Sequence, residues 1–222
     1  MVYQISKILK DVRVCLDRNQ TDTALISDGD EETLQLDDII WSKILEAVRR
    51  VHSVAPYYLL EQGHNFDEQE DVALYWGDQE SGWILLPDDF MRLVVFEMDD
   101  WSRAVYDVIT TSDPQYTYQR SKIKAIRGTA DRPVCALGVR PEGKVLEFYS
   151  CKSTNARVRR GVYIPFPKIE SVEVEGVNVP GVDISERCYD AIVYTIAALT
   201  LVSLGDIEES KNMFEKAQEL AS

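Results

Sequence analysis

Four aspartates in one short stretch are the first side chains of this sequence that could do chemistry. Segment 83–101 reads "WILLPDDFMRLVVFEMDDW", with Asp88 and Asp89 after a proline and Asp99 and Asp100 before the last tryptophan. Paired carboxylates can act as general acid and base, or can hold a divalent metal. Such a site also needs further groups that converge on it. The first question is whether these acids form a site or end a buried stretch.

No motif with a known catalytic mechanism accompanies the four acids. The sequence contains no Gly-x-Ser-x-Gly, Walker, His-Glu-x-x-His or Gly-x-Gly-x-x-Gly pattern. A proline followed by two acids is typical of the start of a helical turn, where unpaired N–H groups favour carboxylates. Acids that follow a strand cap turns. We therefore expect capping residues here, with no catalytic residue, no cofactor and no metal.

A second acidic segment, "SDGDEETLQLDD", invites a calcium-loop interpretation. A calcium loop counted from Asp28 needs glycine at its sixth position, but Thr33 stands there. The pattern fails, and a solvated loop before a helix is expected. The four cysteines have no zinc-ligand spacing and are expected to be buried free thiols; they are Cys15, Cys135, Cys151 and Cys188.

Composition is that of a folded, acidic protein. The 222 residues are 45% hydrophobic and 28% charged, and the formal net charge is −14. Such a surface repels phosphate backbones, which excludes a protein that grips nucleic acid but not one past which DNA moves. The N-terminus lacks an apolar secretory segment. The longest apolar run, 191–204, has 14 residues. A membrane span needs about 20, so a core helix is expected.

Helical spacing marks both ends of the chain. Apolar residues recur every three or four positions in 5–16 and again in 37–52. In the second helix the expected stripe consists of Ile40, Trp41, Ile44, Leu45, Val48 and Val51.

Helix start and stop signals near the C-terminus predict two consecutive helices. Asp183 with Glu186 resembles a capping box, and the helix it opens is expected to end at Leu204. Gly205 supplies a left-handed stop, and Asp206 caps the last helix. That helix is expected to carry Met213, Phe214, Ala217 and Leu220 on one side. The two helices form a hairpin with almost no loop.

Between these helices the period is that of strands. "ALYW" and "GWILL" predict one hairpin, and "RLVVFEM" predicts a further strand. "PVCALGVR" and "KVLEFYSC" flank a turn at Pro141, which places Cys135 opposite either Tyr149 or Ser150. Neither register pairs Cys135 with Cys151, so no disulfide is expected. "GVYIPFP" is expected to be an edge strand because proline cannot donate to a ladder.

The order of helices, strands and helices predicts an α+β protein. Residues 1–60 and 180–222 are expected to form a helical bundle, and 61–179 an inserted antiparallel β-rich lobe. Exposed anchors for partners are expected in the lobe, because aromatic and arginine side chains often dominate interfaces. The candidates are Trp76, Trp83, Trp101, Arg157, Arg159 and Arg160.

Four segments in this order resemble a known family. They are "DDIIWSKILEAVRRVHSVAP", "LLPDDFMRLVVFEMDDW", "RGTADRPVCAL" and "CYDAIVYTIAALTLVSLGDIEESKNMFEKAQELA". Together they resemble the head-to-tail adaptor proteins, also called ring or head-completion proteins, of short-tailed phages, including the crAss-like type. The resemblance spans most of the chain and leaves out the acidic loop at 20–35.

The resemblance implies a structural virion protein, made in the cytoplasm of the bacterial host, that is not an enzyme. Such adaptors form a homo-oligomeric ring, usually of about twelve copies, beneath the portal protein. The ring presents a surface to the next tail or ring protein, and genomic DNA passes through it without specific binding. No membrane is involved. Their fold is a helical bundle with a β-rich extension.

Charge adds an expectation about the channel of such a ring. Acidic walls repel phosphates and keep the DNA central, so "DGDEE" or "DEQED" is expected to line it. The basic cluster of Arg157, Arg159 and Arg160 is expected away from the lumen. Two other functions remain open on the sequence. One is a non-viral interaction module that docks through its C-terminal helical hairpin, and the other is an acid-based metal-dependent hydrolase.

Overall fold

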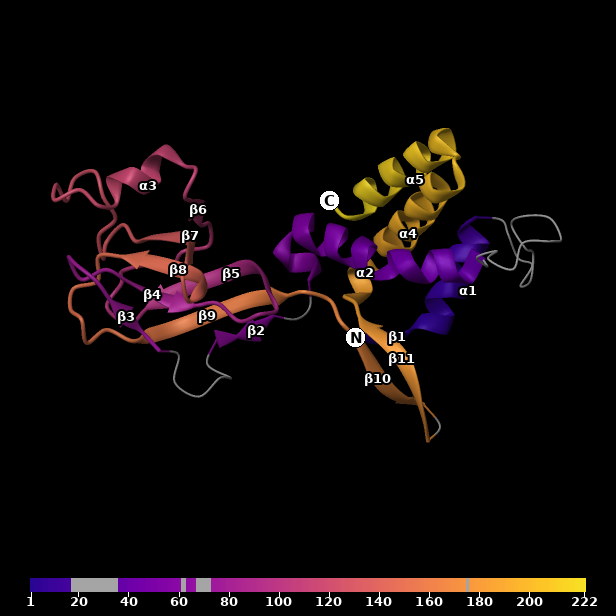
Figure 1. The fold of residues 1–222 in the computed structure, drawn as a ribbon, viewed down its shortest axis with the longest axis horizontal. Helices are drawn as coiled ribbons and strands as arrows, with labels where there is room; N and C mark the ends of the chain where they lie inside the picture. The colour runs from indigo at the N-terminus through magenta and orange to yellow at the C-terminus, as the bar shows by residue number, and fades with distance from the viewer. Residues whose placement is uncertain (17–35, 61–62, 67–72, 175) are drawn as a thin grey trace. The chain divides into compact units, whose positions relative to one another are not determined.

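The computed structural model of the protein describes residues 1–16, 36–60, 63–66, 73–174 and 176–222. The chain divides into two compact units (Figure 1), of which unit 1 joins both ends of the chain and unit 2 is one continuous segment. Unit 1 comprises Met1–Gln62 and Pro167–Ser222, and unit 2 comprises Gly63–Phe166. Helices and mostly antiparallel sheets occur together, which confirms the α+β class.

Unit 1 is built from four α-helices and a small sheet, among the residues described. The helices are α1 (Ile5–Cys15), α2 (Leu36–Val54), α4 (Tyr189–Leu204) and α5 (Ile207–Leu220). Two short 3₁₀ turns, η1 (Tyr57–Leu59) and η3 (Glu186–Cys188), connect them to their neighbours. The strands are β1 (Val2–Gln4), β10 (Ile169–Val174) and β11 (Val177–Asp183), in the order β1-β11-β10.

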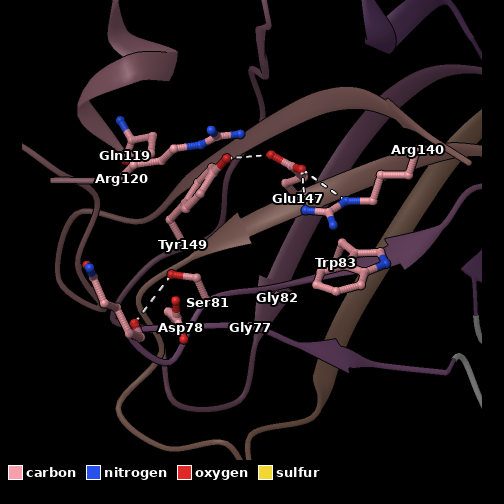
Figure 2. Close-up of a pocket in the computed structure, with 11 residues that line it drawn as sticks. Gly77, Asp78, Ser81, Gly82, Trp83, Gln119, Arg120, Arg140, Glu147 and Tyr149 are labelled. Carbon is pink, nitrogen blue, oxygen red and sulfur yellow. Dashed lines mark hydrogen bonds and ion pairs between the residues drawn. The ribbon is translucent and has the colours of Figure 1, made fainter.

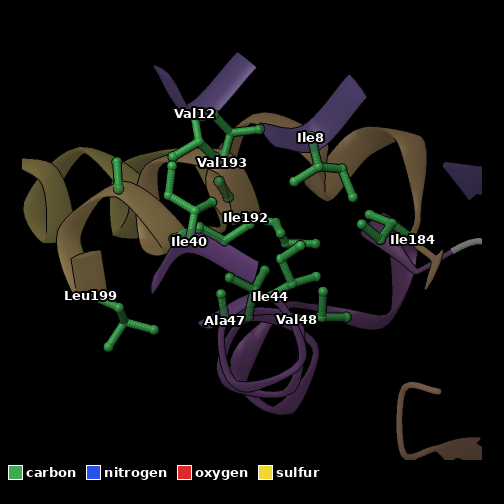
Figure 3. Close-up of a cluster of buried hydrophobic side chains, with 14 of the residues drawn as sticks. Ile8, Val12, Ile40, Ile44, Ala47, Val48, Ile184, Ile192, Val193 and Leu199 are labelled. Carbon is green, nitrogen blue, oxygen red and sulfur yellow. The ribbon is translucent and has the colours of Figure 1, made fainter. Parts of the chain in front are cut away.

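The core of unit 1 is aliphatic and draws on α1, α2 and α4 (Figure 3). Ile8 and Val12 of α1 and Ile44 of α2 are almost wholly removed from water. Each such side chain contributes about 1.5–3 kcal/mol by its burial. The expected stripe of α2 is wrong at Trp41, which is 39% exposed, because it lies outside the arc that faces α4.

Helix α4 is the central helix of unit 1. Its ten buried residues lie on all sides of it, and it contacts α1, α2 and α5. The buried hydroxyls of Thr195 and Thr200 donate to the carbonyls of Ala191 and Ile196, four residues earlier. Among the residues described, Glu186–Leu204 is the one helical stretch with the length and apolar composition of a membrane span. Its burial is that of a core helix.

The turn between α4 and α5 has the predicted glycine stop and aspartate cap. Gly205 has φ 86°, in the left-handed region that favours glycine. The side chain of Asp206 accepts a hydrogen bond from the backbone N–H of Glu209 at 3.2 Å. Both predictions at this turn are confirmed.

The predicted cap of α4 is wrong. Asp183 ends strand β11, and its carboxylate accepts a hydrogen bond from the amino group of Met1 at 2.7 Å. The α-helix begins only at Tyr189, after the 3₁₀ turn. Pairing of β11 with β1 and β10 holds this segment in extended conformation, which a local cap pattern does not reveal.

The pairing of β11 with β1 and β10 also ends the β-rich unit earlier in the chain than the sequence predicted. Residues 167–179 were expected in the β-rich lobe, but they group with unit 1. The reason is that β10 pairs with β11 along its whole length, and β11 pairs with β1 at the N-terminus.

Among its described residues, unit 2 contains two sheets and one short helix. The order in one sheet is β2-β9-β5, and in the other it is β3-β4-β8-β7-β6. Its strands are β2 (His64–Asn65), β3 (Tyr75–Trp76), β4 (Gly82–Leu85), β5 (Phe90–Met98), β6 (Ile109–Thr110), β7 (Val134–Arg140), β8 (Gly143–Tyr149) and β9 (Val158–Pro165). The helix is α3 (Pro114–Tyr118). Only β6 and β7 pair in parallel among the strands described.

Aromatic rings fill the space in the core of unit 2. Phe96 lies edge-on to Trp101 at 5.8 Å and stacks with Phe148 at 6.2 Å, measured between ring centroids. Gly82 in β4 lies against Phe148 so closely that an added Cβ would come within 2.6 Å of its ring. Glycine is therefore required at that position.

Two details of the predicted strands are wrong. Cys135 lies opposite Phe148, because the β7–β8 turn pairs Arg140 with Gly143. Strand β9 is not an edge strand, because β2 pairs with its C-terminal half. Cys135 and Cys151 are both free thiols in the structure.

Candidate functional site

A polar pocket of about 370 Å³ opens in unit 2 (Figure 2). Three parts of the unit form its walls: the β3–β4 turn with the start of β4, the residues that follow α3, and the strands β7 and β8. The lining residues are Gly77, Asp78, Gln79, Ser81, Gly82, Trp83, Gln119, Arg120, Arg140, Glu147 and Tyr149.

The buried carboxylate of Glu147 lies in the wall of this pocket. The side chain is 6% exposed, in a strand whose neighbouring residues are apolar. Tyr116 and Tyr149 donate their hydroxyl hydrogens to Oε2 at 2.9 and 2.5 Å. Arg140 donates from Nε and Nη2 to Oε1 at 3.2 and 2.7 Å. Four donors therefore satisfy both oxygens and link α3 to the β7–β8 hairpin.

Electrostatics keep this network in one protonation state near neutral pH. Burial alone raises the pKa of Glu147, but hydrogen bonds from Tyr149, Arg140 and Tyr116 outweigh it and lower the pKa below its usual value. Burial and the adjacent carboxylate raise the pKa of Tyr149. A catalytic acid or base needs a pKa near the working pH. The pKa values of Glu147 and Tyr149 are both shifted away from neutral pH.

Arg140 also covers the aromatic wall of the pocket. Its guanidinium carbon lies 3.7 Å from the centroid of the Trp83 ring, within the range of a cation–π interaction. Tyr75 stacks with Trp83 at 5.7 Å, with the ring planes 11° apart. Trp83, one of the predicted interface anchors, is thus half-buried and engaged within its own unit.

The turn on one side of the pocket is strained. Gln79 and Glu80 have φ of 62° and 52°, a left-handed conformation that non-glycine residues rarely adopt. Each costs on the order of 1–2 kcal/mol. The Glu80 carbonyl accepts from the Cys151 N–H at 2.9 Å, and Ser81 Oγ accepts from the Ser150 N–H at 3.2 Å. These bonds fix the turn to the segment after β8.

A loop on the other side of the pocket is closed by two polar side chains. Gln119 accepts from the Gly128 N–H at 2.7 Å through Oε1 and donates from Nε2 to the Gln115 carbonyl at 3.0 Å. The buried Arg127 donates to the side chain of Gln79. These contacts hold both ends of the segment 119–128, which we call the basic loop.

The four aspartates of the first question do not converge on one site. The Asp89 carboxylate accepts from the Tyr163 hydroxyl at 3.0 Å. The expected helical turn is instead a β-turn, closed by the Phe90 N–H and the Pro87 carbonyl at 3.0 Å. Asp88 is exposed. Asp88 and Asp89 therefore lie in a turn between β4 and β5.

Asp99 and Asp100 have the capping role that the sequence predicted. Asp99 Oδ1 accepts from the backbone N–H of Arg157 at 3.0 Å. Asp100 Oδ2 accepts from the backbone N–H groups of Lys152 and Ser153. Together they hold the loop between β8 and β9 against the end of β5. This part of the prediction is confirmed.

The other predicted anchors are divided between core and surface. Trp101 is 4% exposed and lies in the core, so it has no surface to offer a partner. Trp76 is half-buried and lies edge-on to Phe148 at 5.3 Å.

The three predicted arginines, 157, 159 and 160, are all exposed at the start of β9. Arg159 makes a single ion pair there, with Glu97 at 3.4 Å. The three arginines thus lie on the surface, whereas Trp101 lies in the core and Trp76 and Trp83 are half-buried.

In the part of the chain that the structure describes, no cluster of metal ligands forms, and Cys135 and Cys151 are buried thiols. Within those ranges, no three His, Cys, Asp or Glu side chains come together as metal ligands. Burial raises the pKa of Cys151 to about 12, and it also raises that of Cys135. Such thiols are not nucleophilic at neutral pH. The stretches "DGDEE" and "DEQED", with the calcium-loop interpretation and the channel lining, lie outside the described residues.

Comparison with known proteins gives no relative: no family model and no curated protein matches the chain.

The Glu147 network and the basic loop were both missed in the sequence. Glu147 interrupts "VLEFY", and a charge inside an apolar strand is a usable signal of a buried, paired group. The basic loop carries "SKIKAIR", four cations and no acid counted with Arg120, in a chain of net charge −14. Its three-dimensional closure by Gln119 has no local signature.

Proposed function

We propose that the protein is a ring-forming head-to-tail adaptor of a short-tailed phage, a structural subunit that joins the portal to the tail. The observation that carries the proposal is the division of the chain. Both ends form one helical unit, and the segment between them forms a separate β unit. This is the organisation that the resemblance of the sequence implies.

In this proposal the two units have separate tasks. The helices of unit 1 form a bundle that seats each copy in the ring, and unit 2 is the inserted β-rich lobe that offers further contacts. Partners are other copies in a ring of about twelve, the portal protein, and the next tail or ring protein. The protein is made in the host cytoplasm and resides in the virion at the head–tail interface.

The use of the polar side chains supports assembly rather than catalysis. Glu147 is bound by four donors, and three of the four candidate aspartates bind backbone or hydroxyl groups in turns. Net charge supports the passage of DNA. An acidic ring has few cations to release the counterions of DNA, so the genome can move through without being held.

Native mass spectrometry of disrupted virions tests the proposal directly. The expected result is a closed ring of this chain, free or with the portal protein. Purified protein incubated with portal should give the same ring by electron microscopy, and the ring should not retain duplex DNA at physiological salt. A protein that is absent from virions, or never exceeds a dimer with portal present, is not a ring adaptor.

A further inference from the structure

The basic loop exposes apolar side chains between lysines. Ile123 and Ile126 are 61% and 50% exposed. The loop is nevertheless ordered: Gln119 and Arg127 hold its ends, and the Ile126 N–H donates to the Ile123 carbonyl at 3.2 Å. Two large aliphatic side chains that a fixed loop holds in water indicate a contact surface.

Cations surround these isoleucines and have no acidic partner among the described residues. Lys122 and Lys124 are exposed, and neither forms an ion pair there. Arg120 lies over the ring of Tyr116 at 5.8 Å, which leaves its guanidinium donors available. The partner that fits this surface is both apolar and acidic.

Unit 1 carries a groove of that chemistry between α1, α4 and α5. Its volume is about 440 Å³. Val14 and Leu220, which are 59% and 41% exposed, lie in it with Val193. These side chains present an open apolar surface that could receive two isoleucines.

The charged residues in the lining of the groove are two acids and one lysine. Asp11 and Asp190 line it, and Asp11 accepts from the Tyr189 hydroxyl at 2.6 Å. The one lysine in the lining, Lys216, is exposed, and its ammonium lies over the ring of Tyr194 at 4.6 Å from the centroid. Exposed cations brought by a partner therefore meet a net negative surface.

We propose that the basic loop of one copy docks into the α1–α4–α5 groove of the next copy. This inference rests on the proposed function and names the subunit contact of the ring. The two faces are different and complementary, and such a heterologous contact closes into a ring when its rotation permits.

The chemistry favours a second copy over the other anionic surfaces that could receive this loop. Phosphate backbones reward lysine and arginine but gain little from exposed isoleucines. An anionic membrane would repel a chain of net charge −14. The groove of a neighbouring copy satisfies both the charge and the apolar area.

Cross-linking between two different full-length variants tests the contact. One carries Ile123→Cys and the other Val14→Cys, both in a Cys15→Ser background, and they are mixed and oxidised with portal present. The expected result is a disulfide-linked heterodimer, identified by its mass. Its yield should be at least about tenfold above the yield in the control mixture. The control replaces Ile123→Cys with Val139→Cys, an 81% exposed position of the same unit. Equal yields from both mixtures overturn the proposal.

A single chain with Ile123→Cys and Val14→Cys separates contact between copies from contact within one. Linked oligomers support the proposal. An internally bridged monomer means that the loop reaches the groove of its own chain, which overturns it.

Charge reversal provides a second measurement. Lys122→Glu with Lys124→Glu should weaken assembly by about tenfold or more, because like charges then face each other. Lys144→Glu with Lys152→Glu is the matched control, since these lysines are also exposed in unit 2. Adding Asp190→Lys to the loop variant should restore part of the association.

The outcomes distinguish this contact from the function on which it rests. If the wild-type protein makes rings and the loop variant makes them equally well, the contact is wrong and the ring function stands. If the wild-type protein makes no ring, the proposed function itself fails. If loop reversal abolishes binding to duplex DNA while rings persist, the loop serves DNA and the contact is again overturned.

Discussion

The carboxylate of Glu147 shows how a buried charge is used in unit 2. It lies where three donor side chains from α3, β7 and β8 converge, and it is their common acceptor. Removing it leaves two hydroxyls and the guanidinium of Arg140, whose side chain is 34% exposed, without that partner. A buried polar group that loses its partner costs about 1–3 kcal/mol.

Glu147→Leu is therefore expected to lower the free energy of unfolding of unit 2 by about 2–4 kcal/mol, mainly because the tyrosine hydroxyls lose their acceptor. Glu147→Gln keeps the shape and should cost about 1–3 kcal/mol, because an amide accepts fewer of the four hydrogen bonds. Denaturant melts followed by tryptophan fluorescence measure both. Glu142→Gln, at an exposed position in the β7–β8 turn, is the control. A loss below about 0.5 kcal/mol for Glu147→Leu would contradict the network.

His52 of α2 should make unit 1 sensitive to mild acid. Burial lowers its pKa from 6.5 to about 4. Between these values the unfolded chain binds a proton that the folded unit does not bind. Stability is therefore complete above about pH 6.5 and falls as the pH drops towards 4, by at most ~3 kcal/mol.

Unfolding titrations of the wild-type protein and of His52→Leu check this dependence. The difference in unfolding free energy between the two proteins should change with pH from 6.5 to 4 and be constant above 7. The contribution of Glu147 to stability changes at lower pH than that of His52. A carboxyl with a lowered pKa loses its contribution only as the pH falls through that pKa. A constant difference between the two proteins across the whole range would show that His52 is not the titrating group.

At the scale of elements, α4 organises unit 1, because three other helices pack on it. Leu199 is 7% exposed in the core of this unit. Leu199→Ala should lower the free energy of unfolding by roughly 2–5 kcal/mol, because apolar burial is lost and a cavity is left behind. Val202→Ala, on the same helix at a 50% exposed position, should cost under about 1 kcal/mol. Equal losses in chemical melts would show that the phase of α4 is wrong.

The elements were predictable where their signals are local. Gly205 and Asp206 mark the α4–α5 turn because one residue sets the backbone conformation and the other binds an N–H three residues on. Asp183 failed as a cap because its strand pairs with β1, at the other end of the chain. The strand β9 was misplaced at an edge because two residues, His64 and Asn65, pair with it from far away.

The candidate site depends on contacts of the same long-range kind. Tyr116 and Glu147 are 31 residues apart, and Arg127 reaches a residue 48 positions earlier. Sequence patterns mark Glu147 as unusual, but they do not name its donors. The tryptophans were predicted as surface anchors from residue type alone. Trp101 is instead a core residue, because aromatic rings fill the interior of small sheets as readily as they fill interfaces.

At the scale of the whole molecule, the two units have separate cores, and no buried residue is common to both among the residues that the structure describes. Denaturation is therefore expected to show two transitions rather than one. Leu199→Ala should shift only the transition of unit 1, and Glu147→Leu only that of unit 2. Their effects should add within about 0.5 kcal/mol, as they do for distant sites. Hydrogen exchange read by mass spectrometry assigns each transition, and a double variant that departs from additivity would show that the units unfold as one.

The composition of unit 1 from both ends of the chain has a consequence during synthesis. Helices α1 and α2 leave the ribosome early, but α4, against which they bury their isoleucines, is made near the end. At bacterial rates of translation that interval is on the order of ten seconds. Unit 2 is continuous and is complete before α4 emerges. Chains from which unit 2 but not α4 has left the ribosome should thus hold a folded β unit and two unfinished helices, which are natural clients for chaperones.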